Sequence, residues 1–219
     1  MKKLVLALVG IAVMAGSAMA QNYEKNIYGV RAGLNVANMS AQGLSANSKA
    51  GFHVAGVYQR LLTSSMPLYL ETGLQISQKG GKFDYEEYAS SLHSSSTKLN
   101  TIYLEVPVMV NYRFNIKDAV TLYPSVGFYY ALGIGGKYKE TESGEFGENI
   151  EYDAFGSTGP CKRSDIGMRF SATADWKHYS FSLGYEFGFV NVVNNSEEFE
   201  IAGAKIKTNN FFISVGYKF

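Results

Sequence analysis

The chain is poor in several residue types that would point to other kinds of protein. It has one cysteine, Cys161, which cannot close an intramolecular disulfide. Only 18% of its 219 residues are charged, which is low for a soluble surface. The 20 basic and 19 acidic residues nearly cancel, so a nucleic-acid partner is not expected. After the first twenty residues no run of about eighteen apolar residues occurs, and no transmembrane helix is predicted there.

Residues that suggest catalysis or metal binding are also scarce. The spacing of the three histidines, His53, His93 and His178, places none beside a serine and an acid. The acidic segment from Glu140 to Asp153 lacks the fixed Asp, Asn and Gly pattern of a calcium loop, so we interpret it as a solvated loop. We therefore expect no enzymatic activity, no cofactor and no metal, and we expect Cys161 to be a loop thiol without a role.

Residues 1–20 have the three parts of a secretory signal peptide. Lys2 and Lys3 are positive, Leu4–Val13 is apolar, and Ala18–Ala20 matches an A-x-A cleavage site. The apolar run is short for a membrane span, which favours cleavage over a membrane anchor. One mature domain covering residues 21–219 is expected.

Glycine and aromatic residues are abundant, with 23 Gly, 16 Tyr and 14 Phe, as is typical of an all-β chain. Eight stretches alternate between apolar and polar or small residues, the pattern of a strand with two different faces. Ala55 and Val57 blur the second stretch, and Phe212 breaks the last. The stretches cover residues 28–36, 51–61, 68–77, 102–114, 120–132, 166–176, 179–189 and 210–219.

The connections between these stretches alternate in length. Four are long, at residues 38–50, 79–98, 135–164 and 191–206, and the others are short. Long external loops and short periplasmic turns are typical of outer-membrane barrels. The sequence therefore predicts an eight-stranded antiparallel transmembrane β-barrel in a bacterial outer membrane, with both termini on the periplasmic side. Pro107 and Pro124 fall inside strands, and a bulge or a water is expected at each.

A soluble β-sandwich would also alternate, because its apolar face is buried between two sheets. Lipid is favoured because the polar faces are rich in Gly, Ser and Thr, and because only Arg60 places a charge on an apolar face, near a strand end. Aromatic pairs at strand ends are typical of a membrane interface. These pairs are Tyr112/Phe114, Trp176/Tyr179 and Tyr217/Phe219.

The last stretch has large apolar residues at every second position and ends in an aromatic residue. It resembles the C-terminal signal that outer-membrane barrels present to their assembly machinery, which we therefore expect as a partner. Outer-membrane lipid and lipopolysaccharide are the other expected partners. The residues of this signal are Phe211, Ile213, Val215, Tyr217 and Phe219.

Two sequence blocks resemble the PorT-like outer-membrane β-barrel family, whose members are often described as porin-family proteins. One block is Leu104–Val108 followed by Asn111–Phe114, and the other begins at Asp165–Gly167 and continues with Tyr185–Gly188. Gly29–Asn35 also resembles the family's first strand. The resemblance implies an eight-stranded barrel. Its founding members assist protein secretion across the outer membrane, which implies possible secretion-machinery partners.

Eight charged residues fall on the inward faces, and the four acids balance the four bases. A buried charge needs a partner, so we predict a structural ion-pair network that fills the lumen. Arg31 and Arg169 are expected to pair with Glu71, Glu105 and Glu186, although a proton or cation path through these glutamates is an alternative. The remaining inward charges are Arg113, Asp175 and Lys218.

The sequence thus predicts a non-catalytic integral outer-membrane protein with a structural or interaction role through its outer loops. A secretion accessory is the second interpretation, because the family resemblance suggests it. A lipid-modifying enzyme or a small pore is less favoured.

Overall fold

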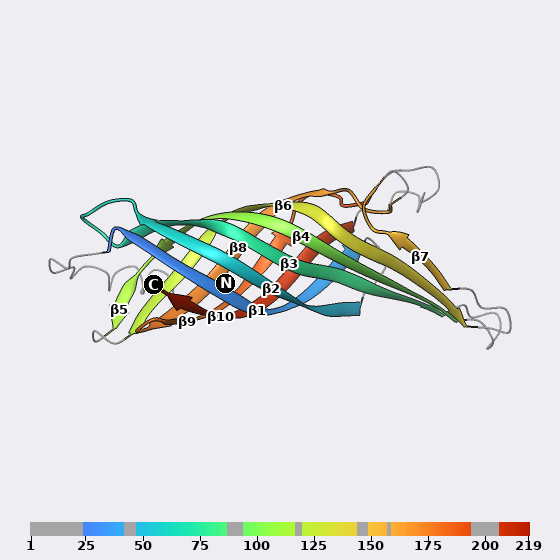
Figure 1. Ribbon diagram of the computed structural model, residues 1–219, viewed down its shortest axis with the longest axis horizontal. Coiled ribbons are helices and arrows are strands. Elements are labelled where there is room, and N and C mark those ends of the chain that lie inside the picture. The colour runs from blue at the N-terminus through green and yellow to red at the C-terminus, as the bar shows by residue number, and fades with distance from the viewer. Residues whose placement is uncertain are drawn as a thin grey trace, which may run out of the picture.

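The computed structural model describes residues 24–41, 47–86, 94–116, 120–143, 149–156, 159–193 and 206–219. The expected signal peptide lies outside these residues. The described part of the chain contains no helix that is long and apolar enough to cross a membrane. It consists of β-strands joined by turns (Figure 1). The strands are β1 (Asn26–Ala41), β2 (Asn47–Leu61), β3 (Leu68–Glu86), β4 (Ser94–Tyr112), β5 (Phe114–Ile116), β6 (Val120–Ser143), β7 (Asn149–Asp153), β8 (Ser164–Trp176), β9 (Tyr179–Gly188) and β10 (Ile206–Lys218).

Eight of these strands close into a barrel. Neighbouring strands follow the order β4-β3-β2-β1-β10-β9-β8-β6, and pairing between β4 and β6 closes the circle. Every pairing is antiparallel, and β1 joins β10 so that the first and last strands are neighbours. The short strands β5 and β7 pair only with the two ends of β6. The predicted all-β, eight-stranded antiparallel barrel is confirmed.

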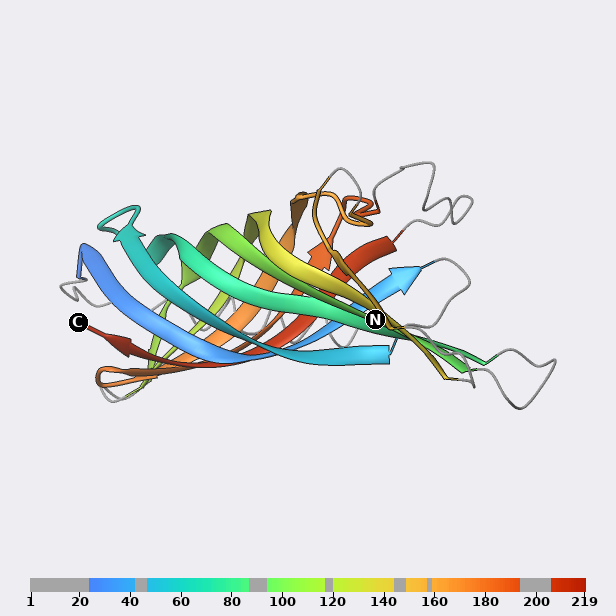
Figure 2. The same cartoon turned by 45° about the vertical axis from the view of Figure 1, so that its right-hand side comes forward.

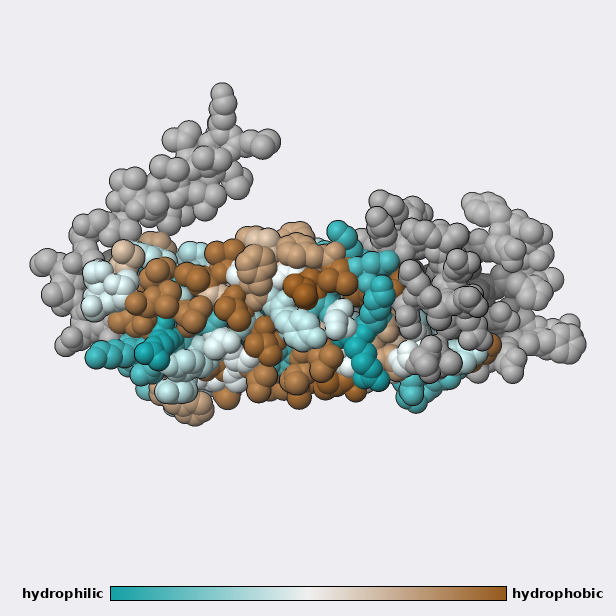
Figure 3. Space-filling view, turned by 90° about the horizontal axis from the view of Figure 1, so that it is seen from above, coloured by the Kyte–Doolittle hydropathy of each residue, from teal (hydrophilic) through white to brown (hydrophobic). Residues whose placement is uncertain are grey.

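Alternation along each strand separates the two faces of the barrel. In β1, Leu34 is 60% exposed and points outward, whereas its neighbour Asn35 is fully buried and points inward. The outward side chains together form a broad apolar band (Figure 3). Such a surface is far larger than the apolar patches of soluble proteins, and it is the surface that a lipid bilayer covers. Five outward residues of β10 and its end belong to it, namely Phe211, Ile213, Val215, Tyr217 and Phe219.

Phe212, which breaks the apolar alternation of the sequence, faces the lumen. Its side chain is 7% exposed, and its ring meets the His53 ring edge-on with centroids 5.8 Å apart. The neighbouring inward position of β1 is Gly33, where an added Cβ would lie 2.0 Å from the Ile213 carbonyl oxygen and 2.6 Å from His53 Cε1. Gly33 thus leaves room for the His53 ring. Gly184 of β9, directly opposite Phe212, does the same for the Phe212 ring, because an added Cβ there would lie 2.4 Å from Phe212 Cζ.

The two strand prolines do not produce the bulges that the sequence suggested. The β3–β4 register is the same on both sides of Pro107, but two cross-strand pairs opposite it are missing. The register places Tyr112 of β4 opposite Pro124, and the pairs Tyr112–Pro124 and Arg113–Tyr123 are both missing, so that Arg113 separates β4 from β5. Because proline lacks a donor, the strands part locally instead of shifting register. The bulge between β4 and β6 lies elsewhere, at Ile134 opposite Ile102 and Tyr103.

Two of the predicted long loops are largely strand. Pairing of β3 with β4 continues as far as Glu86 and Ser94, and β6 continues to Ser143 with β7 beside it. These strands project beyond the rest of the barrel as a sheet, which we name the extension (Figures 1 and 2). The alternation of apolar and polar residues ends where the lipid-facing band ends. Backbone hydrogen bonding between strands does not depend on lipid, so the strands continue beyond the band. The sequence pattern therefore placed the strand ends too early.

Candidate functional site: a charged and closed lumen

One group of charged side chains fills the lumen toward the end that carries the short turns. Arg31 donates to both carboxylate oxygens of Glu71, at 2.7 Å from Nη1 and 3.1 Å from Nη2. Gln59 also donates to Glu71, and Asn111 does so at 3.4 Å. A two-point contact of this kind fixes both side chains more firmly than a single hydrogen bond.

Asp175 lies beside this pair and binds two further bases. Lys218 Nζ is 2.8 Å and Arg113 Nη1 is 3.4 Å from Asp175 Oδ2. The Arg113 guanidinium is also stacked between two aromatic rings, 4.9 Å from the centroid of Tyr69 and 4.5 Å from that of Tyr123. Cation–π contacts compensate in part for the water that the guanidinium has lost.

A second group lies further along the lumen and forms a ring of alternating charge. Lys79 Nζ is 2.6 Å from Glu105 and 2.8 Å from Glu186. Arg169 contacts the same two carboxylates, with Nη2 3.2 Å from Glu105 and Nε donating to Glu186 at 2.6 Å. Each of the four side chains is at most 8% exposed. Gln75 also donates to Glu105 Oε2 at 2.8 Å, and Asn210 donates to Glu186 Oε2 at 3.0 Å.

The structure places the five residues of the predicted lumen network in two groups. Arg31 meets Glu71 in one group, and Arg169 meets Glu105 and Glu186 in the other. Sequence reasoning missed Lys79, which it had assigned to the beginning of a loop. Residues 71, 75, 77 and 79 of β3 all face the lumen, because every second residue of the strand does. Continuing this alternation to residue 79 would have predicted that Lys79 faces the lumen.

Asp165 is the second inward charge that the sequence did not reveal. It is fully buried and accepts hydrogen bonds from Tyr129 at 3.2 Å and Thr208 at 2.5 Å. With Lys79 and Asp165 added to the eight inward charges predicted from the sequence, the set has five acids and five bases and remains neutral.

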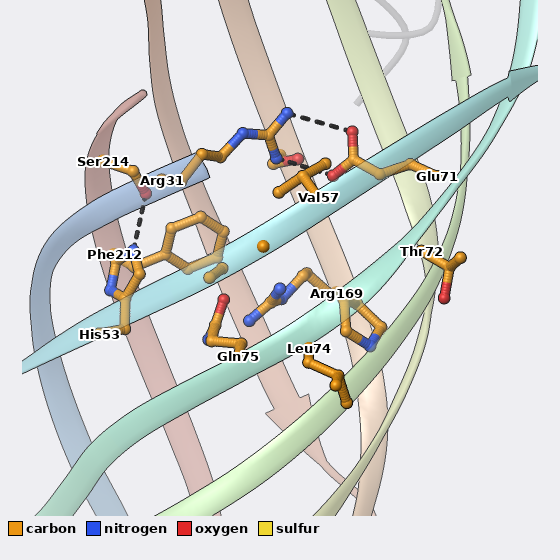
Figure 4. A pocket seen from close by; sticks show the side chains of 14 residues that line it. Arg31, His53, Val57, Glu71, Thr72, Leu74, Gln75, Arg169, Phe212 and Ser214 are labelled. Atoms are coloured by element: carbon orange, nitrogen blue, oxygen red, sulfur yellow. Dashed lines mark hydrogen bonds and ion pairs between the residues drawn. The ribbon is translucent and has the colours of Figure 1, made fainter. Parts of the chain in front are cut away.

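A small cavity separates the two charged groups (Figure 4). Arg31 and Glu71 lie on one side of it, and Arg169 and Gln75 lie on the other. The space open to the centre of a water-sized sphere is about 20 Å³, which is room for little more than one water molecule. Between the two charged groups the lumen is therefore packed rather than hollow.

His53 lies at the edge of this cavity in a chain of three polar side chains. Its Nε2 is 2.8 Å from Ser214 Oγ, and its Nδ1 is 2.8 Å from Asn35 Oδ1. The Asn35 amide nitrogen donates to Ser77 Oγ and the Gln78 carbonyl, each at 3.0 Å, so its oxygen faces the histidine. Nδ1 then carries the proton, and Nε2 accepts from Ser214.

An apolar cap closes the lumen at the extension end. Phe155 packs edge-on against Tyr103 with ring centroids 5.5 Å apart, over the space left by Gly133. Cys161 is buried beneath it and donates its backbone N–H to the Ala154 carbonyl at 3.0 Å. The sequence placed both residues in the long connection 135–164 and did not predict their burial. We name this cluster the cap; its buried members are Met39, Leu99, Tyr103, Tyr129, Ala131, Ala154, Phe155 and Cys161.

Burial gives Cys161 the properties of an apolar core residue. The lack of solvent raises the pKa of its thiol to about 12. A thiol in such surroundings is a poor nucleophile and a poor metal ligand. Within the described ranges, no group of three His, Cys, Asp or Glu side chains is arranged to hold a metal ion.

An apolar exterior, a closed antiparallel barrel and an ion-paired interior together define an integral outer-membrane β-barrel protein. Residues 19–194 match the family described as "Outer membrane protein beta-barrel domain", and the chain belongs to this family. Its location is the outer membrane.

Three solved structures with a similar fold are distant in sequence. The attachment invasion locus protein Ail of Yersinia pestis is 18% identical, with a TM-score of 0.43, and the match covers 90% of this chain and 100% of Ail. Neisserial surface protein A is 14% identical, with a TM-score of 0.44 and the same coverage. OprG of Pseudomonas aeruginosa is 13% identical, with a TM-score of 0.44, 92% of this chain and 99% of OprG. No curated protein matches this chain at a significant level.

Proposed function

We propose that this protein is a non-catalytic, closed outer-membrane barrel with a structural or interaction role at the cell surface. The observation that carries the proposal is the filled lumen, in which two ion-paired groups and the cap follow one another along the barrel. A barrel with such an interior offers its outer surface and its extension, rather than a channel, to other molecules.

The orientation of the barrel follows from its two unequal ends. The beginning of β1, the end of β10 and the short turns, such as Lys177–His178 between β8 and β9, lie at one end, which faces the periplasm in barrels of this kind. The extension then projects from the cell. It is the largest structured element outside the lipid-facing band, which makes it the part best suited to contact a partner.

A hydrolase function is disfavoured although Ser214, His53 and Asn35 have the hydrogen-bond order of a catalytic triad. An acyl substrate must reach the serine oxygen, and the adjoining cavity holds only about one water molecule. A fluorophosphonate probe should therefore label the folded protein no more strongly than it labels the Ser214→Ala variant, in which the serine oxygen is absent. Labelling that requires Ser214 and His53 would reverse this assignment.

A role as a secretion accessory is the second candidate, and the resemblance at Leu104–Val108 favours it. In the barrel, Glu105 of this segment belongs to the lumen network, and Pro107 lies at the gap between β3 and β4. Glu105 and Pro107 of the motif thus have places in the barrel itself. Because the motif can be explained by the structure of the barrel alone, we rank the accessory role second.

The proposal is tested by removing the β3–β4 part of the extension from an otherwise intact barrel. Residues 82–98 are replaced by an Asn-Gly turn, and both forms are captured from native outer membranes after mild crosslinking. We expect surface partners with the full chain only. Secretion components captured equally with both forms would favour the accessory role, and the absence of partners with either form would contradict an interaction role.

A further inference from the structure

Three polar side chains that line the cavity between the two charged groups have unused hydrogen-bonding atoms. Arg169 donates from Nε and Nη2, whereas its Nη1 has no hydrogen-bond partner among the described residues, although the side chain is only 8% exposed. Gln75 donates from Nε2 to Glu105, and no described donor reaches its Oε1. The Ser171 hydroxyl likewise has no partner in the described part of the chain. Buried polar atoms of this kind cost free energy unless a ligand or a water satisfies them.

The size of the cavity limits what can satisfy these atoms. The space open to the centre of a water-sized sphere is about 20 Å³, so a ligand cannot be much larger than one water molecule. His53 and Ser214 also line the cavity, but they already hydrogen-bond to each other at 2.8 Å (Figure 4). Arg169, Gln75 and Ser171 thus offer the occupant one donor group, one acceptor and one hydroxyl that can do either.

The charges of the lining decide between a cation, an anion and a neutral molecule. The guanidinium groups of Arg31 and Arg169 border the cavity, and they would repel a cation. The Glu71 carboxylate and the Gln75 amide oxygen border it as well, so that an anion would meet acceptors on the same walls. A small neutral molecule that both accepts and donates hydrogen bonds matches this mixed lining.

We propose that the cavity binds one water molecule, held by Arg169, Gln75 and Ser171. The water accepts a hydrogen bond from Arg169 Nη1, donates one to Gln75 Oε1 and makes a third with Ser171 Oγ. Three hydrogen bonds are typical of a buried water in a protein. The inference rests on the proposed closed lumen and deepens it, because this water is a fixed part of the packing between the two charged groups.

The experiment compares crystal structures of the full mature chain and two variants, at a resolution that shows ordered water. Ser171→Val replaces the hydroxyl with methyl groups that occupy the cavity. Thr173→Val is the matched control, because Thr173 lies two residues further along the same face of β8 and is buried, but bonds Ser182 at 2.9 Å and does not line the cavity. Crystals of the unaltered protein are also soaked in bromide, which anomalous scattering distinguishes from water.

The unaltered protein and Thr173→Val should each show one water peak within hydrogen-bond distance of Arg169 and Gln75, and Ser171→Val should lack it. A bromide peak at this place would show an anion site and overturn the proposal. So would a cavity without a peak in the unaltered protein, or a water that stays in place in Ser171→Val. Conductance of the barrel is measured separately, so a closed lumen without this water is distinguishable from an open lumen, which would contradict the proposed function itself.

Discussion

Arg31 and Glu71 show at the scale of single residues how the lumen is held closed. Their two hydrogen bonds join β1 to β3 across β2, and Tyr123 from β6 accepts a further hydrogen bond from Arg31 at 3.2 Å. Removing the guanidinium would leave a carboxylate that is 7% exposed with only amide donors. Such a carboxylate is costly because, among the described residues, no base other than Arg31 lies within ion-pair distance of it.

Arg31→Ala should therefore lower the free energy of unfolding by about 3–5 kcal/mol, less if water enters the space. Lys137→Ala, which removes an exposed base from the extension, should change it little. Urea unfolding of the two purified variants in detergent micelles measures the difference. The double variant Arg31→Ala, Glu71→Gln should recover part of the loss. Equal effects of the two single substitutions would show that the Arg31–Glu71 pair does not stabilise the barrel.

Cys161 provides a residue-scale test of the cap. Because the pKa of the buried thiol is about 12, its thiolate fraction at pH 8 is on the order of 1 in 10,000. Maleimide should therefore label it far more slowly than an exposed cysteine introduced by Lys162→Cys in a Cys161→Ala background. Phe155→Ala, which removes one aromatic ring of the cap, should increase the rate at which Cys161 is labelled. Fast labelling of the unaltered protein would mean that the cap is open.

At the scale of elements, apolar alternation was enough to predict all eight barrel strands, because lipid outside and polar packing inside impose it on every strand. It could not predict the extension, whose two faces are not sorted by lipid. It also could not predict the cap, whose Phe155 and Cys161 become neighbours of Tyr103 only when the chain folds back over the lumen. Sequence reasoning missed Lys79 because this residue lies where the apolar alternation gives way to the extension. It missed Asp165 because this residue lies at the start of β8.

The last strand carries a further prediction. Phe219 is 74% exposed, and its backbone N–H donates to the Tyr28 carbonyl at 3.0 Å, next to the closure between β1 and β10. Its ring therefore contributes little to the folded core and is available to the assembly machinery. Phe219→Asp should lower the amount of heat-modifiable barrel in membranes, while Phe114→Asp in the short β5 serves as the comparison. Normal assembly of Phe219→Asp would contradict the assembly-signal interpretation.

At the scale of the whole molecule, the orientation in the membrane can be measured directly. In a Cys161→Ala background, single cysteines at Lys98 and Lys139 of the extension should react with a membrane-impermeant maleimide on intact cells. A cysteine at Ser65, in the turn between β2 and β3, should react only after permeabilisation. The opposite pattern would place the extension in the periplasm and contradict the proposed orientation.

The central claim concerns the interior of the barrel, which is filled by ion pairs and covered by the cap. Single-channel recording of the purified protein in planar bilayers tests it most directly, with a wide porin as the positive control. Because the cavity between the charged groups has room for only about one water molecule, the barrel should show no steady conductance. A large and stable conductance would contradict the closed lumen and make the protein a pore.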